Sequence, residues 1–534
     1  MFHDASHFMA YNLKSPLFDS DTDSDSDSWS TTCQESYDTT FEEGFKGGLT
    51  ETHIDLLSTL PFEVISNIFY HACKPIYRNR KWERDCYPLL LGRISRQYRQ
   101  YAWATSELWT TIVIRVNPPK LTAQTKLLEE WLARTMGRPI DIYFEIETPG
   151  PIQWEISMLL SNPSNNNQPS VIPMIHLLAK HSLKWRCIEF NIPSTWYPIF
   201  TSSTEYPIVA DNYEVQLFSM PLDLPVLMSA SLHCSDGVLT IAQQGVELDL
   251  TLAPSLRALS LSRIQILPII FERVDFEQIT NLTFAHVYSI DLCDLLPRLP
   301  NLQEATFHHV TFSQPSQNFI HQKLCKLEVD VHKDRPLQQI LGYMILPRLE
   351  VLNVCIPTTM DYSTIFRRFA TLSSKPHITS LSLSCKITRE FHLIDVLSAL
   401  NSLRELYIRD SSTEVTPDFG LSSTFFDVLY PEEEYPHLPS LELFSYQGNL
   451  VVQAIDFLEP FVIRSRMRGG SSGADGNLAK FAVLEKVKIQ ADQVSNSAEL
   501  SIAEYPDSQF IWEIMTMMEE GILKLITMDG KCWE

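Results

Sequence analysis

Apolar residues recur along most of this chain in short groups that have two different spacings. From Trp109 onward, the dominant group is a triplet with the spacing L-x-x-L-x-L. Its middle residue is, in chain order, Ile112, Ile142, Ile188, Ala230, Leu259, Leu282, Ala305, Leu327, Leu352, Leu381, Leu406, Phe444 and Val487. The second and third residues of each triplet lie two positions apart, and this period predicts a strand that buries one face. One more strand is expected at 522–526.

Helical stripes occupy the segments between these expected strands. In the segment 125–137, Leu128 and Trp131 share one helical face, and Gly137 is placed to end the helix. The segment 364–374 has the same kind of stripe. A strand, a helix and a parallel strand, repeated many times, predict a right-handed α/β solenoid in which each unit buries its apolar residues against its neighbours.

The spacing of the triplets is similar to that of leucine-rich-repeat proteins. From Leu259 to Leu406 the middle residues lie 23, 23, 22, 25, 29 and 25 positions apart, which is within the range of that family. The gaps are wider on either side of this block. The repeats also lack the Asn or Cys that regular leucine-rich repeats place after the strand, so we expect an irregular, leucine-rich-repeat-like solenoid.

The second spacing, with apolar residues three and four positions apart, is found before Trp109. Pro61 opens the first such segment at a position where a helix tolerates a missing N–H. Val64, Ile65, Ile68 and Phe69 then form one apolar stripe. A second segment, from Leu90 to Ala102, has the same pattern. Because two short amphipathic helices cannot bury such stripes alone, they must pack on each other, on the following chain or on a partner.

This stretch resembles the F-box, in the F-box-like form found in fungal proteins. That form reads L-P-x-E-[IVL]-[IL]-x-x-[IV]-F, then a Leu-rich helix ending in S-R-x-[WY]-R, then Ala and Leu-Trp before a strand. The matching residues are Leu60, Pro61, Glu63, Val64, Ile68, Phe69, Ser95, Arg96, Tyr98, Arg99, Ala102, Leu108 and Trp109. The family usually has Trp at the position of Tyr98. The resemblance covers about 50 residues of this chain and implies a small all-helical module.

The composition fits an intracellular globular protein with an acidic tail. The formal net charge of −23 argues against general binding to nucleic acid or to an anionic membrane. Residues 1–55 carry 12 acidic and 2 basic side chains, which predicts a disordered acidic tail over 1–52. The ten cysteines show no CxxC pair, and the N-terminus lacks the pattern of a signal peptide. A cytoplasmic or nuclear location is therefore expected.

These patterns give the fold class and the expected domains. The fold class is α/β, with an F-box-like helical module over 53–110 and the leucine-rich-repeat-like solenoid over 111–534. Polar stretches near 161–170 and 468–477, rich in Asn and Pro or in Gly and Ser, are expected to be flexible insertions.

The F-box resemblance implies a partner and a function. Family members bind the small acidic adaptor of cullin-based (SCF-type) ubiquitin ligases and recruit a protein target for ubiquitination. The positions that would bind the adaptor are Leu60, Pro61, Val64, Ile65, Ile68 and Phe69. A run of eight basic residues between Lys74 and Tyr101 could complement the acidic adaptor, contact nucleic acid or form an ordinary solvated face.

The polar residues that alternate with the buried strand residues are expected to form the target-binding surface of a solenoid. The positions chosen for this role are Thr306, His308, Glu328, Asp330, Asn353, Tyr407 and Arg409. Their mixed polar character suggests an unknown protein target and no small molecule.

Signals for catalysis are weak in this sequence. On an extended strand the side chains of His308 and His309 point to opposite sides, which makes a shared metal difficult. Cys293, Cys325, Cys355 and Cys385 are spaced as core thiols of successive repeats would be. No nucleophile, phosphate or zinc motif is present, so no catalytic residue, metal or cofactor is expected. The alternative to the ligase subunit is a ligase-independent interaction scaffold, and an enzyme on a solenoid frame is a third possibility.

Overall fold

The structure is a computed structural model of the chain. It describes residues 60–74, 76–78, 81–83, 88–146, 171–193, 208–210, 213–215, 222–235, 239–240, 253–265, 276–288, 290–313, 317–331, 334–356, 362–373, 376–387, 389–410, 420–430, 438–452, 455–466, 481–494 and 508–526. The expected tail over 1–52 and the two insertions near 161–170 and 468–477 lie outside these residues. The chain divides into two units, Met1–Leu60 and Pro61–Glu534, and every helix and strand below belongs to the second.

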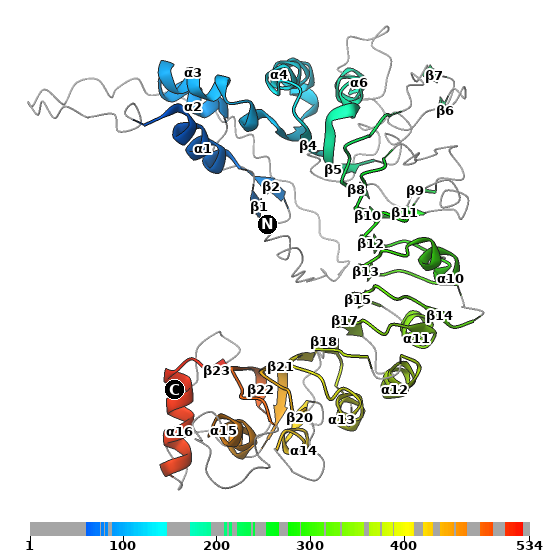
Figure 1. Cartoon of the computed structure of the whole chain (residues 1–534), viewed down its shortest axis with the longest axis vertical. Helices are drawn as coiled ribbons and strands as arrows, with labels where there is room; N and C mark the ends of the chain where they lie inside the picture. The colour runs from blue at the N-terminus through cyan, green and yellow to red at the C-terminus, as the bar shows by residue number, and fades with distance from the viewer. Residues whose placement is uncertain are drawn as a thin grey trace, which may run out of the picture. The chain divides into compact units, whose positions relative to one another are not determined.

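One large parallel sheet of 15 strands runs through the second unit (Figure 1). Its strands, in spatial order, are β3 (Thr111–Val116), β4 (Ile140–Ile146), β5 (Trp185–Ile192), β8 (Ser229–Cys234), β10 (Ala258–Ser262), β12 (Asn281–Ala285), β13 (Glu304–His308), β15 (Lys326–Asp330), β17 (Val351–Ile356), β18 (Ser380–Cys385), β19 (Glu405–Asp410), β21 (Leu443–Val451), β22 (Lys486–Val494) and β23 (Leu523–Ile526). The fifteenth strand, β20 (Leu421–Ser422), pairs with the far end of β21. Apart from β20, the strands follow one another in chain order.

All of the expected strands are present, and their apolar residues form continuous rows across the sheet. Leu259 of β10 lies opposite Leu282 of β12, which lies opposite Ala305 of β13 and so on along the sheet. These residues and those two positions later are buried, while the residues between them are half-buried or exposed. The parallel register thus places every triplet on the same side, and this is what makes the sheet amphipathic.

Helices connect many of the strands. They are α4 (Leu121–Arg134), α6 (Ile172–Ala179), α10 (Leu292–Leu295), α11 (Asp334–Leu341), α12 (Ser363–Leu372), α13 (Glu390–Ser398), α14 (Ser423–Asp427), α15 (Glu459–Arg466) and α16 (Ser508–Glu519), with short 3-10 turns η3 (Pro118–Lys120), η4 (Ser182–Lys184), η6 (Leu296–Arg298) and η7 (Ile455–Leu458). In α4, Leu128 and Trp131 are buried as expected, and the helix ends before Gly137, which has a positive φ of 82°. Successive helices such as α11, α12 and α13 pack side by side.

Short helices precede the sheet, as the sequence predicts. They are α1 (Phe62–Cys73), α2 (Pro88–Ile94) and α3 (Arg96–Ala104), followed by the 3-10 turn η2 (Ser106–Trp109). The basic segment between α1 and α2 forms a small antiparallel pair, β1 (Ile76–Arg78) and β2 (Lys81–Glu83). Three further two-stranded pairs accompany the large sheet: β6 (Ile208–Ala210) with β7 (Tyr213–Val215), β9 (Leu239–Thr240) with β11 (Ile264–Gln265), and β14 (Phe319–Ile320) with β16 (Met344–Ile345). Among the described helices, none combines the length and apolar character needed to cross a bilayer.

Candidate recognition surfaces

The first candidate surface is an exposed apolar stripe on α1. The helix buries Ile65, Phe69 and Cys73, which lie four residues apart on one face. On the neighbouring face, the side chains of Val64 and Ile68 remain 43% and 42% exposed. A surface helix usually has one apolar stripe facing its own core and a polar opposite side. Helix α1 therefore carries more apolar surface than its own packing uses.

Two more positions extend this stripe at helical spacing. Pro61 lies three residues before Val64, Ala72 lies four residues after Ile68, and both are exposed. Leu60, which precedes Pro61, is half-buried. We call Pro61, Val64, Ile68 and Ala72 the α1 stripe.

The buried face of α1 packs on α3. The ring of Phe69 lies 5.4 Å from the ring of Tyr98, and the ring of Phe62 lies 5.8 Å from that of Tyr101. Helix α3 starts where it does because the Ser95 side chain accepts a hydrogen bond from the Tyr98 amide at 3.0 Å, a standard N-terminal cap. Tyr98 thus packs against the inner side of α1.

This packing changes the interpretation of two of the six expected adaptor contacts. Ile65 is 0% exposed and Phe69 is 2% exposed, because both are covered by the chain's own helices. A partner cannot contact them in this conformation. Pro61, Val64 and Ile68 are the members of the expected set that the structure leaves on the surface.

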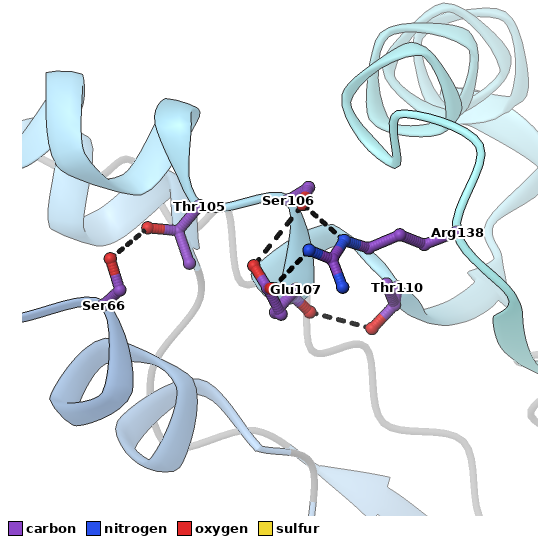
Figure 2. A network of polar contacts seen from close by, with 6 residues as sticks. All are labelled: Ser66, Thr105, Ser106, Glu107, Thr110 and Arg138. Carbon is purple, nitrogen blue, oxygen red and sulfur yellow. Dashed lines mark hydrogen bonds and ion pairs between the residues drawn. The ribbon is translucent and has the colours of Figure 1, made fainter. Parts of the chain in front are cut away.

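A polar network connects α1 to the residues that lead into the sheet (Figure 2). Ser66 of α1 and Thr105 share a hydrogen bond of 2.8 Å between their hydroxyl oxygens. Beside Thr105, Arg138 donates from Nε to the Ser106 hydroxyl at 2.7 Å and pairs with the Glu107 carboxylate at 2.6 Å. Arg138 lies just before β4, so these contacts fasten η2 to both α1 and the second strand of the sheet.

Stacked cationic and aromatic groups reinforce the same junction. The guanidinium of Arg134 lies 5.4 Å from the ring of Trp103 and 4.8 Å from the ring of Trp109. Trp131 packs edge-on against Trp109 and donates its indole N–H to the Trp109 carbonyl at 2.8 Å. Cation–π contacts contribute about 0.5–1 kcal/mol each at exposed sites and about 2 kcal/mol when desolvated. The α1 stripe is consequently presented by a well-supported helix.

Part of the expected basic run can be placed on this module. Arg93 and Arg96 are exposed. Arg99 donates from Nε to the Gly92 carbonyl at 2.8 Å and lies 5.5 Å from the Trp103 ring. The remaining basic residues of the run, apart from Lys74, lie outside the described residues or have side chains that are not described.

The second candidate surface is the polar side of the sheet, where the seven expected target-binding residues lie. The register aligns Thr306, Glu328 and Asn353 in one row and His308 with Asp330 in another. Tyr407 and Arg409 lie in these same two rows on β19, beyond the intervening strand β18. Strands β13, β15, β17 and β19 therefore bring the seven side chains to one side, and none of them is fully buried.

Two histidines converge on one carboxylate within this surface. The Asp330 carboxylate lies 3.8 Å from His308 Nδ1 and 3.7 Å from His309 Nε2. Glu328 lies 3.8 Å from the other nitrogen of His308. The expectation that His308 and His309 point to opposite sides is wrong. It assumed an extended backbone, whereas His309 has a positive φ of 52°, which turns its ring back toward Asp330.

Burial and these contacts shift the pKa of the Asp330 carboxyl in opposite directions. Burial raises the pKa of the Asp330 carboxyl, but the hydrogen bond from His308 and the charges of His309 and His308 outweigh it, so the pKa is lowered. Asp330 therefore stays ionised, with two histidine rings beside its carboxylate. On the nearby strand β8, burial first, then Arg263 and His286, lower the pKa of His233 to about 4, which keeps that ring neutral.

A repeated turn that sequence reasoning missed ends three successive strands. Arg263, His286 and His309 lie 23 residues apart, and all have positive φ between 52° and 57°. Each donates its backbone N–H to a carbonyl of the next strand at 2.8 Å, and the ring centroids of His286 and His309 lie 4.8 Å apart with the rings tilted by 43°. The sequence contains a pattern that could have predicted this turn, because each of the three residues is followed by a buried Ile or Val at the same 23-residue interval.

The thiols of the described residues offer no activated nucleophile. Burial first, then the charge of Asp330, raises the pKa of Cys355 to about 11, and burial raises that of Cys385 to about 12. Both therefore remain protonated near neutral pH. No group of His, Cys, Asp or Glu among the described residues is arranged to hold a metal ion.

Comparison with known proteins adds no further assignment. No protein-family model matches the sequence, and no curated protein matches it.

Proposed function

We propose that this chain is the substrate-recognition subunit of a cullin-based ubiquitin ligase. In this proposal α1–α3 form an F-box-like module that binds the acidic adaptor, and the parallel sheet with its helices is a right-handed, leucine-rich-repeat-like solenoid that holds the target. The observation that supports it most is the α1 stripe, because Val64 and Ile68 occupy adaptor-facing positions of the F-box pattern and remain exposed.

The stripe provides enough apolar surface to contribute to docking. Full burial of a Val or Ile side chain stabilises a complex by about 1.5–3 kcal/mol, so covering the exposed part of Val64 and Ile68 would contribute about 1 kcal/mol each. Pro61 and Leu60 would add to this contact. Ile65 and Phe69 would act indirectly, by fixing α1 on α3. The exposed Arg93 and Arg96 would attract an acidic adaptor and increase the association rate.

The proposed mechanism is proximity and requires no catalytic group in this chain. The module would hold the ligase core, and the sheet would hold a protein target, in the cytoplasm or nucleus, close to the ubiquitin carrier. Holding two reactants together converts a bimolecular reaction into an effectively intramolecular one. The bond chemistry would belong to other subunits.

The test is co-purification of the adaptor with the full chain. We expect wild type to retain the adaptor and the Val64→Glu/Ile68→Glu double variant to lose it, with unchanged thermal unfolding. The matched control is Trp512→Glu/Met515→Glu on α16, where two apolar side chains are also exposed. This control is expected to retain the adaptor.

Two results would contradict the ligase proposal. One is a wild-type chain that binds no adaptor, and the other is equal binding by wild type and the α1 variant. The first result would favour the scaffold alternative. The contacts of Ser66 with Thr105 and of Arg138 with η2 are compatible with that alternative, because they suit a module that only covers the end of the sheet.

A further inference from the structure

Three lysines lie together on the polar side of the last two strands. Lys486 and Lys488 are on β22, and Lys524 is on β23. The residues that alternate with them, including Val487 and Ile489, are buried. Lys486 and Lys524 are exposed, while Lys488 is half-buried. We call these three residues the lysine patch.

The register places two of these cations directly opposite each other. Lys488 of β22 is paired with Lys524 of β23. Like charges at directly opposite positions of neighbouring strands are destabilising. None of the three lysines forms an ion pair with a carboxylate in the part of the chain that the structure describes. The fold therefore carries a local repulsion that its own described side chains do not relieve.

The neighbouring strands continue the patch with uncharged and basic groups. Ser445 of β21 and Tyr407 of β19 lie in the same row as Lys488, and Tyr407 is 36% exposed. Gln447 and Arg409 lie in the next row. Glu405 of β19 lies in the row of Lys486, two strands away, where it interacts with Tyr407 and accepts a hydrogen bond from the Ser380 hydroxyl at 3.0 Å.

We propose that the lysine patch, together with Tyr407, binds an extended acidic segment of a partner protein. This inference rests on the proposed function, since it names the class of target segment that the sheet would hold. Neighbouring strands lie about 4.8 Å apart, so β19 to β23 spans about 14 Å. An extended peptide rises about 3.3 Å per residue, so four to five residues with two or three carboxylates would cover the patch.

An acidic peptide fits this surface better than nucleic acid does. Nucleic acid presents a continuous row of phosphates and is bound by long basic tracks. This patch is short and belongs to a chain with a net charge of −23. The uncharged hydroxyl and amide groups of Ser445 and Gln447 are suited to a peptide backbone, and the Tyr407 ring is suited to an apolar side chain next to the carboxylates.

Fluorescence anisotropy with the full chain tests this inference. The probe is a fluorescein-labelled decapeptide of alternating glutamate and serine, and a lysine-serine decapeptide is its opposite-charge control. We expect the acidic probe to bind wild type with an affinity that falls as NaCl is raised. The Lys488→Glu/Lys524→Glu variant is expected to lose at least tenfold in affinity.

Matched variants distinguish an effect of the lysine patch on peptide binding from an effect of the net charge of the chain. Lys120 and Lys126, both exposed near α4, provide a control, because Lys120→Glu/Lys126→Glu changes the charge by the same amount. This control is expected to bind the acidic probe as wild type does. Equal loss in both variants, or no binding by wild type, would overturn the inference. Tighter binding of a thymidine 15-mer than of the acidic peptide would also overturn it.

Adaptor co-purification distinguishes failure of this inference from failure of the proposed function. The Lys488→Glu/Lys524→Glu variant is expected to retain the adaptor, because its substitutions lie on the last two strands of the sheet order, whereas α1 precedes the first strand, β3. If wild type binds the acidic peptide but not the adaptor, the lysine-patch inference is supported and the ligase proposal is contradicted. If wild type binds the adaptor but not the acidic peptide, the ligase proposal is supported and the lysine-patch inference is contradicted.

Discussion

Strands β13 and β15 and strands β22 and β23 all present charged side chains on the polar side of the sheet. The two regions differ in whether other side chains of the chain contact those charged groups. In the first region, Asp330 lies within 3.8 Å of both His308 and His309. In the second, Lys488 and Lys524 face each other without a carboxylate among the described residues. A charged group that contacts polar side chains of its own chain contributes to the fold, whereas one without such contacts is available to a partner. Surface charge alone would not separate these two roles.

The largest expected effect comes from breaking the strand next to the lysine patch. Gly448 of β21 has a positive φ of 153° at an irregularity in its pairing with β22. An added Cβ would overlap the Asp410 Cβ and lie 2.8 Å from the Tyr446 hydroxyl. We expect Gly448→Ala to lower the free energy of unfolding by about 2–4 kcal/mol, as measured by chemical denaturation.

The control for this substitution is Gly92→Ala in α2. There, an added Cβ would meet only Arg99, at ordinary contact distance. Helix propensity predicts a gain of about 0.5–1 kcal/mol for this change. A Gly448→Ala variant as stable as wild type would mean that β21 does not constrain the position of β22, and the contrast between the two regions would lose its structural basis.

An intermediate effect is expected from removing the charge of Asp330. Asp330→Asn keeps the shape of the side chain but removes the negative charge that faces His308 and His309. We expect a loss of about 1–2 kcal/mol in the free energy of unfolding, because hydrogen bonds to charged groups are stronger than neutral ones. Asp395→Asn is the matched control, since Asp395 forms an exposed pair with Arg367 at 2.9 Å. That change is expected to stay within about 0.5 kcal/mol of wild type.

The smallest effect, of opposite sign, is expected at the lysine patch. Lys524→Glu places a carboxylate opposite Lys488 and replaces a repulsive pair with an attractive one. A cross-strand pair of opposite charges contributes about 0.2–1 kcal/mol, so the melting temperature is expected to rise slightly while acidic-peptide binding falls. A drop in melting temperature would show that Lys524 already has a stabilising partner, contrary to the comparison made above.

The strands of the sheet could be predicted from the sequence, while the turns could not. The L-x-x-L-x-L triplets predicted thirteen strands of the large sheet, from β3 to β22, because period-two burial depends only on the order of apolar residues. They did not predict β20, and β23 was expected separately. The direction of His309 depended on a backbone angle that no apolar pattern encodes. The helix α1 was likewise predicted, but the division between buried Phe69 and exposed Ile68 required the position of Tyr98 on α3. The role of Lys524 required the register between β22 and β23.

The residues with positive φ at 263, 286 and 309 divide this part of the chain into equivalent units of 23 residues. Each has the same backbone angle, donates to the same place on the following strand and precedes a branched aliphatic residue. Removing residues 264–286 would join Arg263 to Val287 and recreate the same local sequence pattern, with one strand fewer. Gene duplication or an engineer could therefore lengthen or shorten the large sheet here in steps of 23 residues, and this deletion would also remove β11, the partner of β9.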